Sequence, residues 1–265
     1  MGLEINSLPV ANYMTPYPVK ASPSAYFSDV VDFMTNRGIG NLVVMEAKKP
    51  IGILTERELL LCAMSHPNDF SDIQVRDIGY QRFISIEPNM SVLKAAKTMI
   101  KNRSRLLVFD NSKLVGIITA SDMLRAFRKT DEKPPLERVI SKKIHYCSPN
   151  DSIFKAIKLM HQKRIGSVVV KNKGLGIFTE RDLLVNVLAN NIDLNKPLKG
   201  YCSYPLITAK HGILASEAAD IMAKNRVKRL GLVKNGSLVG IVTARDIVDA
   251  YQITYPTSDP YLENN

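Results

Sequence analysis

The chain of 265 residues lacks an apolar run of about 20 residues, the length that a helix needs to cross a bilayer. It has only three cysteines, Cys62, Cys147 and Cys202, and no Cys-x-x-Cys pair. This argues against a disulfide scaffold and for a reducing compartment. No basic segment followed by an apolar one opens the chain, so no secretory signal is visible. We therefore expect a cytoplasmic protein that does not associate with membranes.

The sequence also lacks the common catalytic signatures. There is no Gly-x-Ser-x-Gly, no P-loop and no pair of candidate catalytic acids. His145 and Cys147 lie two residues apart, but no second ligand pair accompanies them, so we interpret them as part of an ordinary strand. We expect a protein that is not an enzyme and that holds neither a metal nor a cofactor.

Positive charge is in excess, because 36 basic side chains oppose 25 acidic ones and give a net charge of +11. A basic protein attracts polyanions such as nucleic acid, anionic membranes or phosphorylated small molecules. The basic residues are spread along the chain, with only short clusters such as Lys142–Lys143. A solvated, lysine-rich surface explains this distribution equally well.

One seven-residue pattern occurs four times, at intervals of 60 to 64 residues. Each copy has a glycine, two apolar residues, a threonine and an acid three residues after the threonine. This recurrence at a regular spacing is stronger evidence for a repeat protein than any single motif, because chance does not produce the same pattern four times. The copies are Gly52–Glu58, Gly116–Asp122, Gly176–Asp182 and Gly240–Asp246.

A helix with one buried face is predicted before each motif, because apolar residues recur there at i, i+3, i+4 and i+7. A short apolar strand follows each helix, and a second helix follows each motif, for example over 182–189 and 246–251. The helical stripes are Phe27, Val30, Val31, Met34; Val92, Ala95, Ala96, Met99; Ile153, Ala156, Ile157, Met160; and Ala215, Ala218, Ala219, Met222. The strands are 42–45, 106–109, 168–170 and 230–233. One such unit is too small to bury both faces of its sheet, so units should pair.

Local signals mark the boundaries. Helix starts are expected at Ser22–Ser24, Pro88–Ser91 and Ser148–Asp151, which carry N-cap residues, and less clearly at 209–212. Asn235–Gly236 predicts a hairpin turn. The polar, proline-broken stretch 129–135 is expected to be a linker between the second and third repeats.

The four repeats resemble the cystathionine β-synthase (CBS) domain, and two in tandem resemble a Bateman module. The resemblance covers residues 10–251, and four such repeats resemble the layout of the γ-subunits of AMP-activated protein kinase and of stand-alone archaeal CBS proteins. It implies an α/β (α+β) fold in which two modules form a flat disc. The first module is 10–130, with repeats 10–68 and 75–130, and the second is 131–253, with repeats 136–192 and 198–253.

The Thr-x-x-Asp/Glu end of each motif has two interpretations. The threonine precedes a helix, and an acid three residues later completes a capping box. Capping boxes favour Glu or Gln at this last position, however, and three repeats carry Asp there. The aspartates therefore argue against capping as the whole explanation. A short acid suits a ribose diol, the glycine permits a close approach of the backbone, and a helix N-terminus attracts phosphate.

The resemblance implies that the motif threonine and acid both cap the helix and bind a ligand. It also implies further site residues. Arginines that start two of the central strands are implied phosphate contacts, and Ser167 and Asn41 hold the matching place in the odd repeats. The first strand of a partner repeat would read the adenine edge; these strands are Val19–Lys20, Ile84–Ser85, Ile144–His145 and Ile207–Thr208. The implied ligand residues are Thr119, Asp122, Arg105, Thr179, Asp182, Thr243, Asp246 and Arg229. Thr55 and Glu58 fit less well, because a longer acid would crowd the ribose.

The resulting prediction is a regulatory module that binds AMP, ADP or ATP and acts through a protein partner or a homodimer. The alternatives are a nucleic-acid-binding protein that uses its basic surface and a sensor of an S-adenosylmethionine-type ligand. No helix-turn-helix or aromatic stacking motif supports the nucleic-acid alternative. We also expect the second module to bind nucleotide more tightly, since both of its motifs end in Asp.

Overall fold

The computed structural model describes residues 2–67, 69–171 and 173–255. These residues form two compact units, each assembled from stretches that are far apart in the sequence. The odd unit, Val19–Arg82 with Ile144–Leu206, holds the first and third repeats. The even unit holds the second and fourth repeats and comprises, of the described residues, 2–18, 83–143 and 207–255. The modules 10–130 and 131–253 and their assembly into a disc concern how the two units combine, so they stay predictions.

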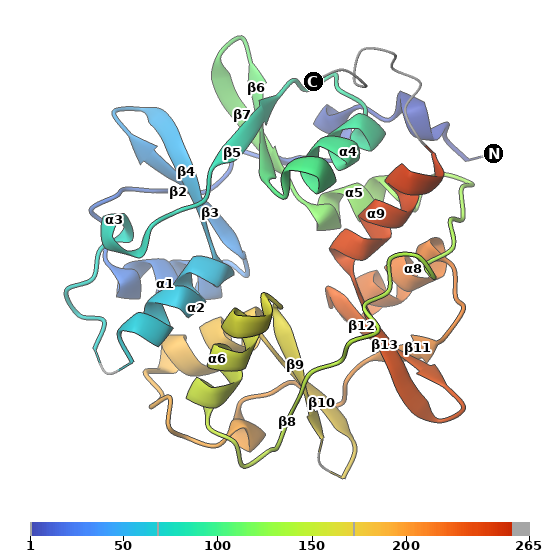
Figure 1. Ribbon diagram of the computed structural model, residues 1–265. Helices are drawn as coiled ribbons and strands as arrows, with labels where there is room; N and C mark the ends of the chain where they lie inside the picture. The colour runs from blue at the N-terminus through green and yellow to red at the C-terminus, as the bar shows by residue number, and fades with distance from the viewer. Residues whose placement is uncertain (1, 68, 172, 256–265) are drawn as a thin grey trace. The chain divides into compact units, whose positions relative to one another are not determined.

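Each repeat of the odd unit has a three-stranded sheet, with one parallel and one antiparallel pair (Figure 1). The first repeat contains β2 (Lys20–Ala21), α1 (Phe27–Asn36), β3 (Asn41–Glu46), β4 (Lys49–Thr55) and α2 (Glu56–Ser65), and the short α3 (Val75–Ile78) follows it within the odd unit. The third contains β8 (Tyr146–Cys147), α6 (Ile153–Lys163), β9 (Ser167–Lys171), β10 (Leu175–Thr179) and α7 (Glu180–Asp182). A π-helical turn over Leu183–Val187 and 3₁₀ turns over Leu188–Asn190 and Leu198–Gly200 follow α7.

The even unit repeats this plan. The second repeat contains β5 (Phe83–Ile86), α4 (Val92–Asn102), β6 (Arg105–Asp110), β7 (Lys113–Ile118) and α5 (Ala120–Phe127). The fourth contains β11 (Thr208–Lys210), α8 (Ala215–Asn225), β12 (Arg229–Lys234), β13 (Ser237–Thr243) and α9 (Ala244–Thr254). Short 3₁₀ turns at Ile5–Ser7 and Val10–Asn12 lead into β1 (Thr15–Pro16). This strand pairs with β7 and is the fourth strand in the sheet of the second repeat.

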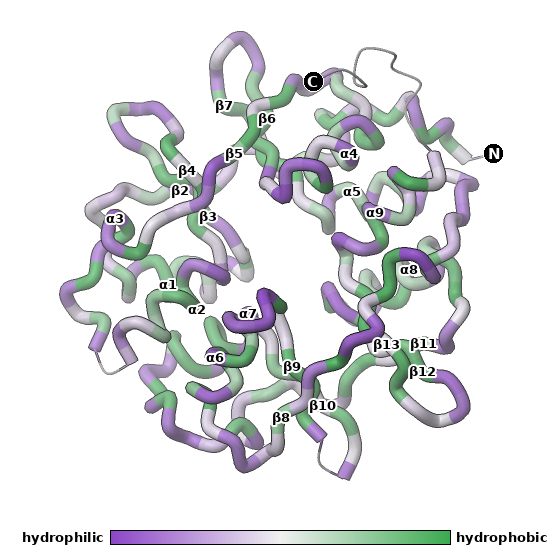
Figure 2. The backbone as a smooth tube through the Cα atoms, viewed as in Figure 1, coloured by the Kyte–Doolittle hydropathy of each residue, from purple (hydrophilic) through white to green (hydrophobic). Residues whose placement is uncertain are grey.

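The predicted helical stripes form the core, since all sixteen of their apolar residues are buried. In the even unit, α4, α5, α8 and α9 pack together, and the rings of Phe127 and Tyr251 stack with centroids 4.3 Å apart. In the odd unit, α1, α2 and α6 enclose a second core. Figure 2 shows apolar colour along α1 and α2, whereas the motif segment α7 is hydrophilic. Each core is therefore shared by two repeats of the same parity, and the predicted pairing of consecutive repeats into modules stays a prediction.

Reciprocal arginines join the two repeats of the odd unit. Arg57 Nη1 donates to the carbonyl of Ile165 at 3.0 Å and lies 3.3 Å from Glu180. Arg181 Nη1 donates in the same way to Ile39 at 2.8 Å and lies 3.4 Å from Glu56. The Glu-Arg pair inside the odd-numbered motifs thus holds the repeats together, a role that the sequence did not reveal.

Most local boundaries agree with the sequence, with two differences in the helices. Ser91 and Ser152 cap α4 and α6, but α1 begins at Phe27 after an uncapped Tyr26, so the predicted start at Ser22–Ser24 is too early. The helix predicted over 182–189 is instead a short α-helical turn followed by a π-helical one. The linker 129–135 is anchored to the even unit, because the carbonyl of Pro134 accepts a 3.0 Å bond from Ala215.

Candidate functional site

The motif threonine and acid form a capping box in all four repeats. In the fourth, Asp246 Oδ2 accepts from Thr243 N at 2.7 Å and from Thr243 Oγ1 at 2.8 Å. The carboxylates of Glu58, Asp122 and Asp182 accept the same two bonds from their threonines. Our expectation that aspartate cuts against capping is wrong, because the shorter side chain still reaches both donors.

Other parts of the protein approach the motif glycines closely. A Cβ on Gly52 would lie 2.2 Å from the Tyr80 ring, and one on Gly176 would lie 2.4 Å from the Tyr204 ring. Met14 and Ile140 cover Gly116 and Gly240 in the same way. The predicted close approach therefore exists, but another segment of the chain makes it, so the glycine by itself is no sign of a ligand.

These covering segments place one polar residue beside each motif. Gln81, Ser203 and Ser141 exchange backbone hydrogen bonds of 2.9–3.1 Å with the residue after the motif glycine. Thr15 occupies the equivalent place opposite Ile117 in β7. Sequence reasoning missed this set; the signal that could have found it is that each lies three or four residues before a predicted partner strand.

Three of the four motif acids use their second oxygen to bind these residues. Gln81 Nε2 donates to Glu58 Oε1 at 2.8 Å, and Ser203 Oγ donates to Asp182 Oδ1 at 2.5 Å. Asp122 Oδ1 accepts from Thr15 at 3.4 Å and lies 2.9 Å from the Arg125 guanidinium.

Asp246 differs from the other three acids. Within residues 2–67, 69–171 and 173–255, no hydrogen bond reaches its Oδ1, and the equivalent Ser141 side chain is solvent-exposed. Burial raises the pKa of Asp246 above its ordinary value, although the hydrogen bonds from Thr243 and the charge of Arg229 act in the opposite direction. A largely desolvated carboxylate with an open oxygen is a ready acceptor for a ligand donor.

Cations collect in the same unit as Asp246. Arg105 and Arg229 begin β6 and β12, as predicted, and Arg229 lies directly across from Thr243 in the β12–β13 register. Burial lowers the pKa of Arg245, and the charges of Arg105 and Arg103 lower it further. Guanidinium groups close enough to repel one another favour an anion between them, and phosphate suits their geometry.

The remaining predicted residues divide between the two units. Val19, Lys20, Ile144 and His145 belong to the odd unit with Thr179, Asp182 and Ser167, whereas Ile84, Ser85, Ile207 and Thr208 belong to the even unit. Ser167 and Asn41 lie across from the motif threonines Thr179 and Thr55. Clefts that combine Asp122 with Val19–Lys20, or Asp246 with Ile144–His145, would draw on both units and stay a prediction.

The described residues offer neither a metal cluster nor a membrane-spanning helix. In the described part of the chain, no group of three His, Cys, Asp or Glu side chains could hold a metal ion. No helix there is both long enough and apolar enough to span a bilayer. The three cysteines are unpaired, and burial raises the pKa of both Cys62 and Cys147 to about 11.

Comparison with known proteins identifies the family. The CBS domain model matches four segments of the chain, residues 10–64, 75–129, 136–189 and 198–253. The chain therefore belongs to the CBS domain family.

Archaeal proteins are among its relatives. Protein MJ1404 of Methanocaldococcus jannaschii is 28% identical over 94% of this chain, which spans 62% of that protein. The crystal structure of MJ1225 from the same organism, a proposed archaeal homologue of g-AMPK, superposes with a TM-score of 0.76 at 20% identity, covering 91% of this chain and 99% of that one. A conserved protein of Pyrococcus horikoshii gives a TM-score of 0.65 at 22% identity, covering 92% and 100% of the two chains. These likenesses support the mixed α/β fold of four CBS repeats.

Proposed function

We propose that this chain is a regulatory module that binds an adenine nucleotide and passes its state to a partner protein or a second copy. The observation that carries the proposal is the open Oδ1 of Asp246, held in place by a capping box that uses only Oδ2. A ribose hydroxyl can donate to this oxygen without displacing any bond that holds the helix start. The family membership and the likeness to MJ1225 are consistent with this role.

The charge near Asp246 favours a phosphorylated ligand over a plain nucleoside. The charge of Arg229, at the start of β12, acts on Asp246 in α9, and Arg245 is close enough to Arg105 and Arg103 for their charges to affect it. A phosphate would relieve this repulsion between cations. We propose Arg229 and Arg105 as phosphate contacts.

In the other motifs a ribose hydroxyl would have to share the second oxygen with an existing donor or displace it, because that oxygen already accepts a bond from Gln81, Thr15 or Ser203. We therefore propose that the Asp246 site fills first. This ranking refines the expectation that the second module binds more tightly, and it leaves the sites at Glu58, Asp122 and Asp182 as weaker ones. The role is regulatory, not catalytic, and we place the protein in the cytoplasm because its cysteines are unpaired.

The test is a calorimetric titration of the full chain with AMP, ADP, ATP, adenosine and S-adenosylmethionine. Asp246→Asn should weaken AMP binding by about 1–3 kcal/mol, because one charge-assisted bond is lost. The matched control is Asp122→Asn, whose second oxygen is already bonded to Thr15 and Arg125. It should leave the tightest site unchanged.

Arg229→Ala separates the phosphate from the nucleoside, since it should weaken AMP more than adenosine. Unchanged AMP affinity in a folded Asp246→Asn protein would refute the ribose assignment. Tight binding of single-stranded nucleic acid with a steep salt dependence would instead favour the alternative that uses the basic surface. Preference for S-adenosylmethionine within the panel would keep the site and change the ligand.

A further inference from the structure

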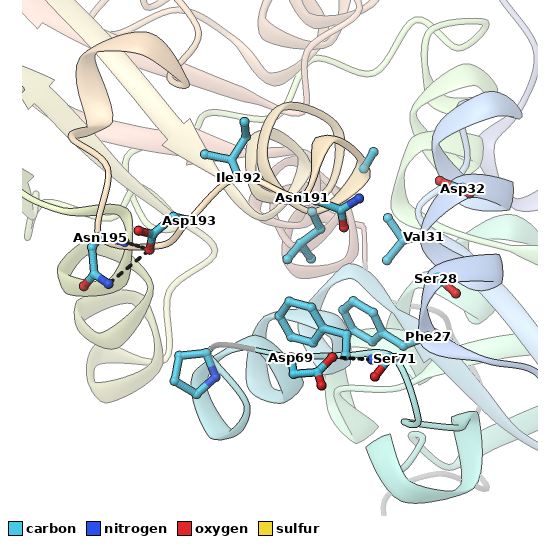
Figure 3. A pocket seen from close by; sticks show the side chains of 14 residues that line it. Phe27, Ser28, Val31, Asp32, Asp69, Ser71, Asn191, Ile192, Asp193 and Asn195 are labelled. Carbon is cyan, nitrogen blue, oxygen red and sulfur yellow. Dashed lines mark hydrogen bonds between the residues drawn. The ribbon is translucent and has the colours of Figure 1, made fainter.

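A cavity of about 490 Å³ opens inside the odd unit, away from its Thr-x-x-Asp/Glu motifs. It lies between α1 and the loop after α2 on one side, and the segment from Leu188 to Asn195 on the other (Figure 3). Both repeats of the unit contribute to its walls. Its size falls in the range of pockets that hold one small molecule.

The floor of the cavity is apolar. Phe27 and Phe70 stack with ring centroids 4.5 Å apart and planes 14° from parallel. Val31 and Leu188 are buried beside them, and Ile192 is half-buried. Such a floor can accept aliphatic carbon, and the Phe ring faces also attract cations.

The rim of the cavity is acidic in a protein whose net charge is +11. Asp32, Asp69 and Asp193 line the cavity from three different segments, and Figure 3 shows them on different sides of it. The backbone amide and hydroxyl of Ser71 lower the pKa of Asp69, which keeps that carboxylate ionised. No ion pair with any other described residue involves these three carboxylates.

We propose that this cavity binds an aliphatic polyamine, a flexible chain whose ammonium groups are separated by apolar spacers. Carboxylates on different walls fit several spaced cations, whereas a compact metal ion needs ligands that converge on one point. The spacers would lie over the Phe27–Phe70 floor, and the ammonium groups would reach the rim. This ligand is distinct from the proposed nucleotide, and its site lies in the other compact unit from Asp246.

The experiment titrates the full chain by calorimetry with spermidine, with a neutral diol of similar length and with magnesium chloride. Spermidine should bind one molecule per chain, and its affinity should fall as salt rises. The diol should bind at least tenfold more weakly, because it lacks the charges. Magnesium should not compete at equal concentration.

The key variant is Asp32→Asn with Asp69→Asn and Asp193→Asn. Each exposed charge pair contributes two- to threefold, so the triple variant should bind spermidine about tenfold more weakly, which is about 1.4 kcal/mol. Asparagine keeps the oxygen that accepts from Ser71 or Asn195, so the loops are retained. The matched control removes three exposed acids of the same unit that do not line the cavity: Asp29→Asn, Asp72→Asn and Glu46→Gln.

A second variant tests the cavity without changing its charge. Ser28 is an exposed lining residue of α1, so Ser28→Trp should fill the space and reduce spermidine binding while the melting temperature stays within a few degrees. Asp246→Asn should leave spermidine binding unchanged, which separates this proposal from the nucleotide site. Equal losses in the triple variant and its control, or equal binding of spermidine and the diol, would overturn the polyamine assignment.

Discussion

The motif glycines should differ in how well they tolerate alanine, and the structure ranks them. A Cβ at Gly52 would lie 2.2 Å from Tyr80 Cδ2, 2.9 Å from Tyr80 Cγ and 3.0 Å from the Gln81 carbonyl oxygen. At Gly116 the nearest atom, 2.3 Å away, is the Met14 sulfur. A flexible thioether can swing aside more easily than a ring that meets the Cβ close to its own attachment point, at Cγ.

The magnitudes follow from two opposing effects. Overpacking costs about 1–3 kcal/mol, and replacing glycine by alanine recovers about 0.4–1 kcal/mol by restricting the unfolded chain. We therefore expect Gly52→Ala to lower the free energy of local unfolding around the substituted motif by about 1–2 kcal/mol. Gly116→Ala should change the free energy of local unfolding around its own motif by less than about 1 kcal/mol. Gly200→Ala is the control, since nothing lies within 4 Å of its added Cβ.

The assay is native-state hydrogen exchange, read at the amides of Ile53 and Gln81, which bond to each other's carbonyls at 2.9 Å. The double variant Gly52→Ala with Tyr80→Ala should recover part of the loss, because the ring that the Cβ meets is gone. Gly52→Ala with exchange as slow as the wild type, or a loss that Tyr80→Ala does not reduce, would refute the packing argument.

Three further predictions concern titration, thiols and helix capping. Burial raises the pKa of Asp246 in the folded protein, so as the pH is lowered its carboxylate should be protonated, and adenosine affinity lost, at a higher pH than for an ordinary aspartate. If the wild type and Asp246→Asn showed the same dependence of adenosine affinity on pH, this prediction would be contradicted. Burial raises the pKa of all three thiols, to about 11 for Cys62 and Cys147, but Cys202 is only half-buried; at pH 8 a thiol reagent should therefore modify Cys202 before the other two, and all three after denaturation. Ser91→Ala and Ser152→Ala should each cost about 1 kcal/mol of stability in urea unfolding; no change in midpoint would show that these caps contribute nothing.

Ligand chemistry could be predicted only in part. The sequence identified the motif acids and Arg229, and the structure places Arg229 across from Thr243. It could not show which acid keeps an oxygen open, because that depends on Thr15, Gln81, Ser141 and Ser203. Local pattern does not record which segment covers which motif, since the covering residues lie up to 102 positions from the glycine they approach, as Met14 does from Gly116.

The sequence by itself determined the repeat number, the helical stripes, the central strands and the family, because periodicity and turn chemistry are local. Only the tertiary structure decided that Arg57 and Arg181 join the first and third repeats, and that the motif glycines accommodate Tyr80 and Tyr204. The cavity lined by Phe27, Phe70 and three separate carboxylates is likewise a product of tertiary folding. Its walls come from segments more than a hundred residues apart, and only packing of the two apolar helix faces brings them together.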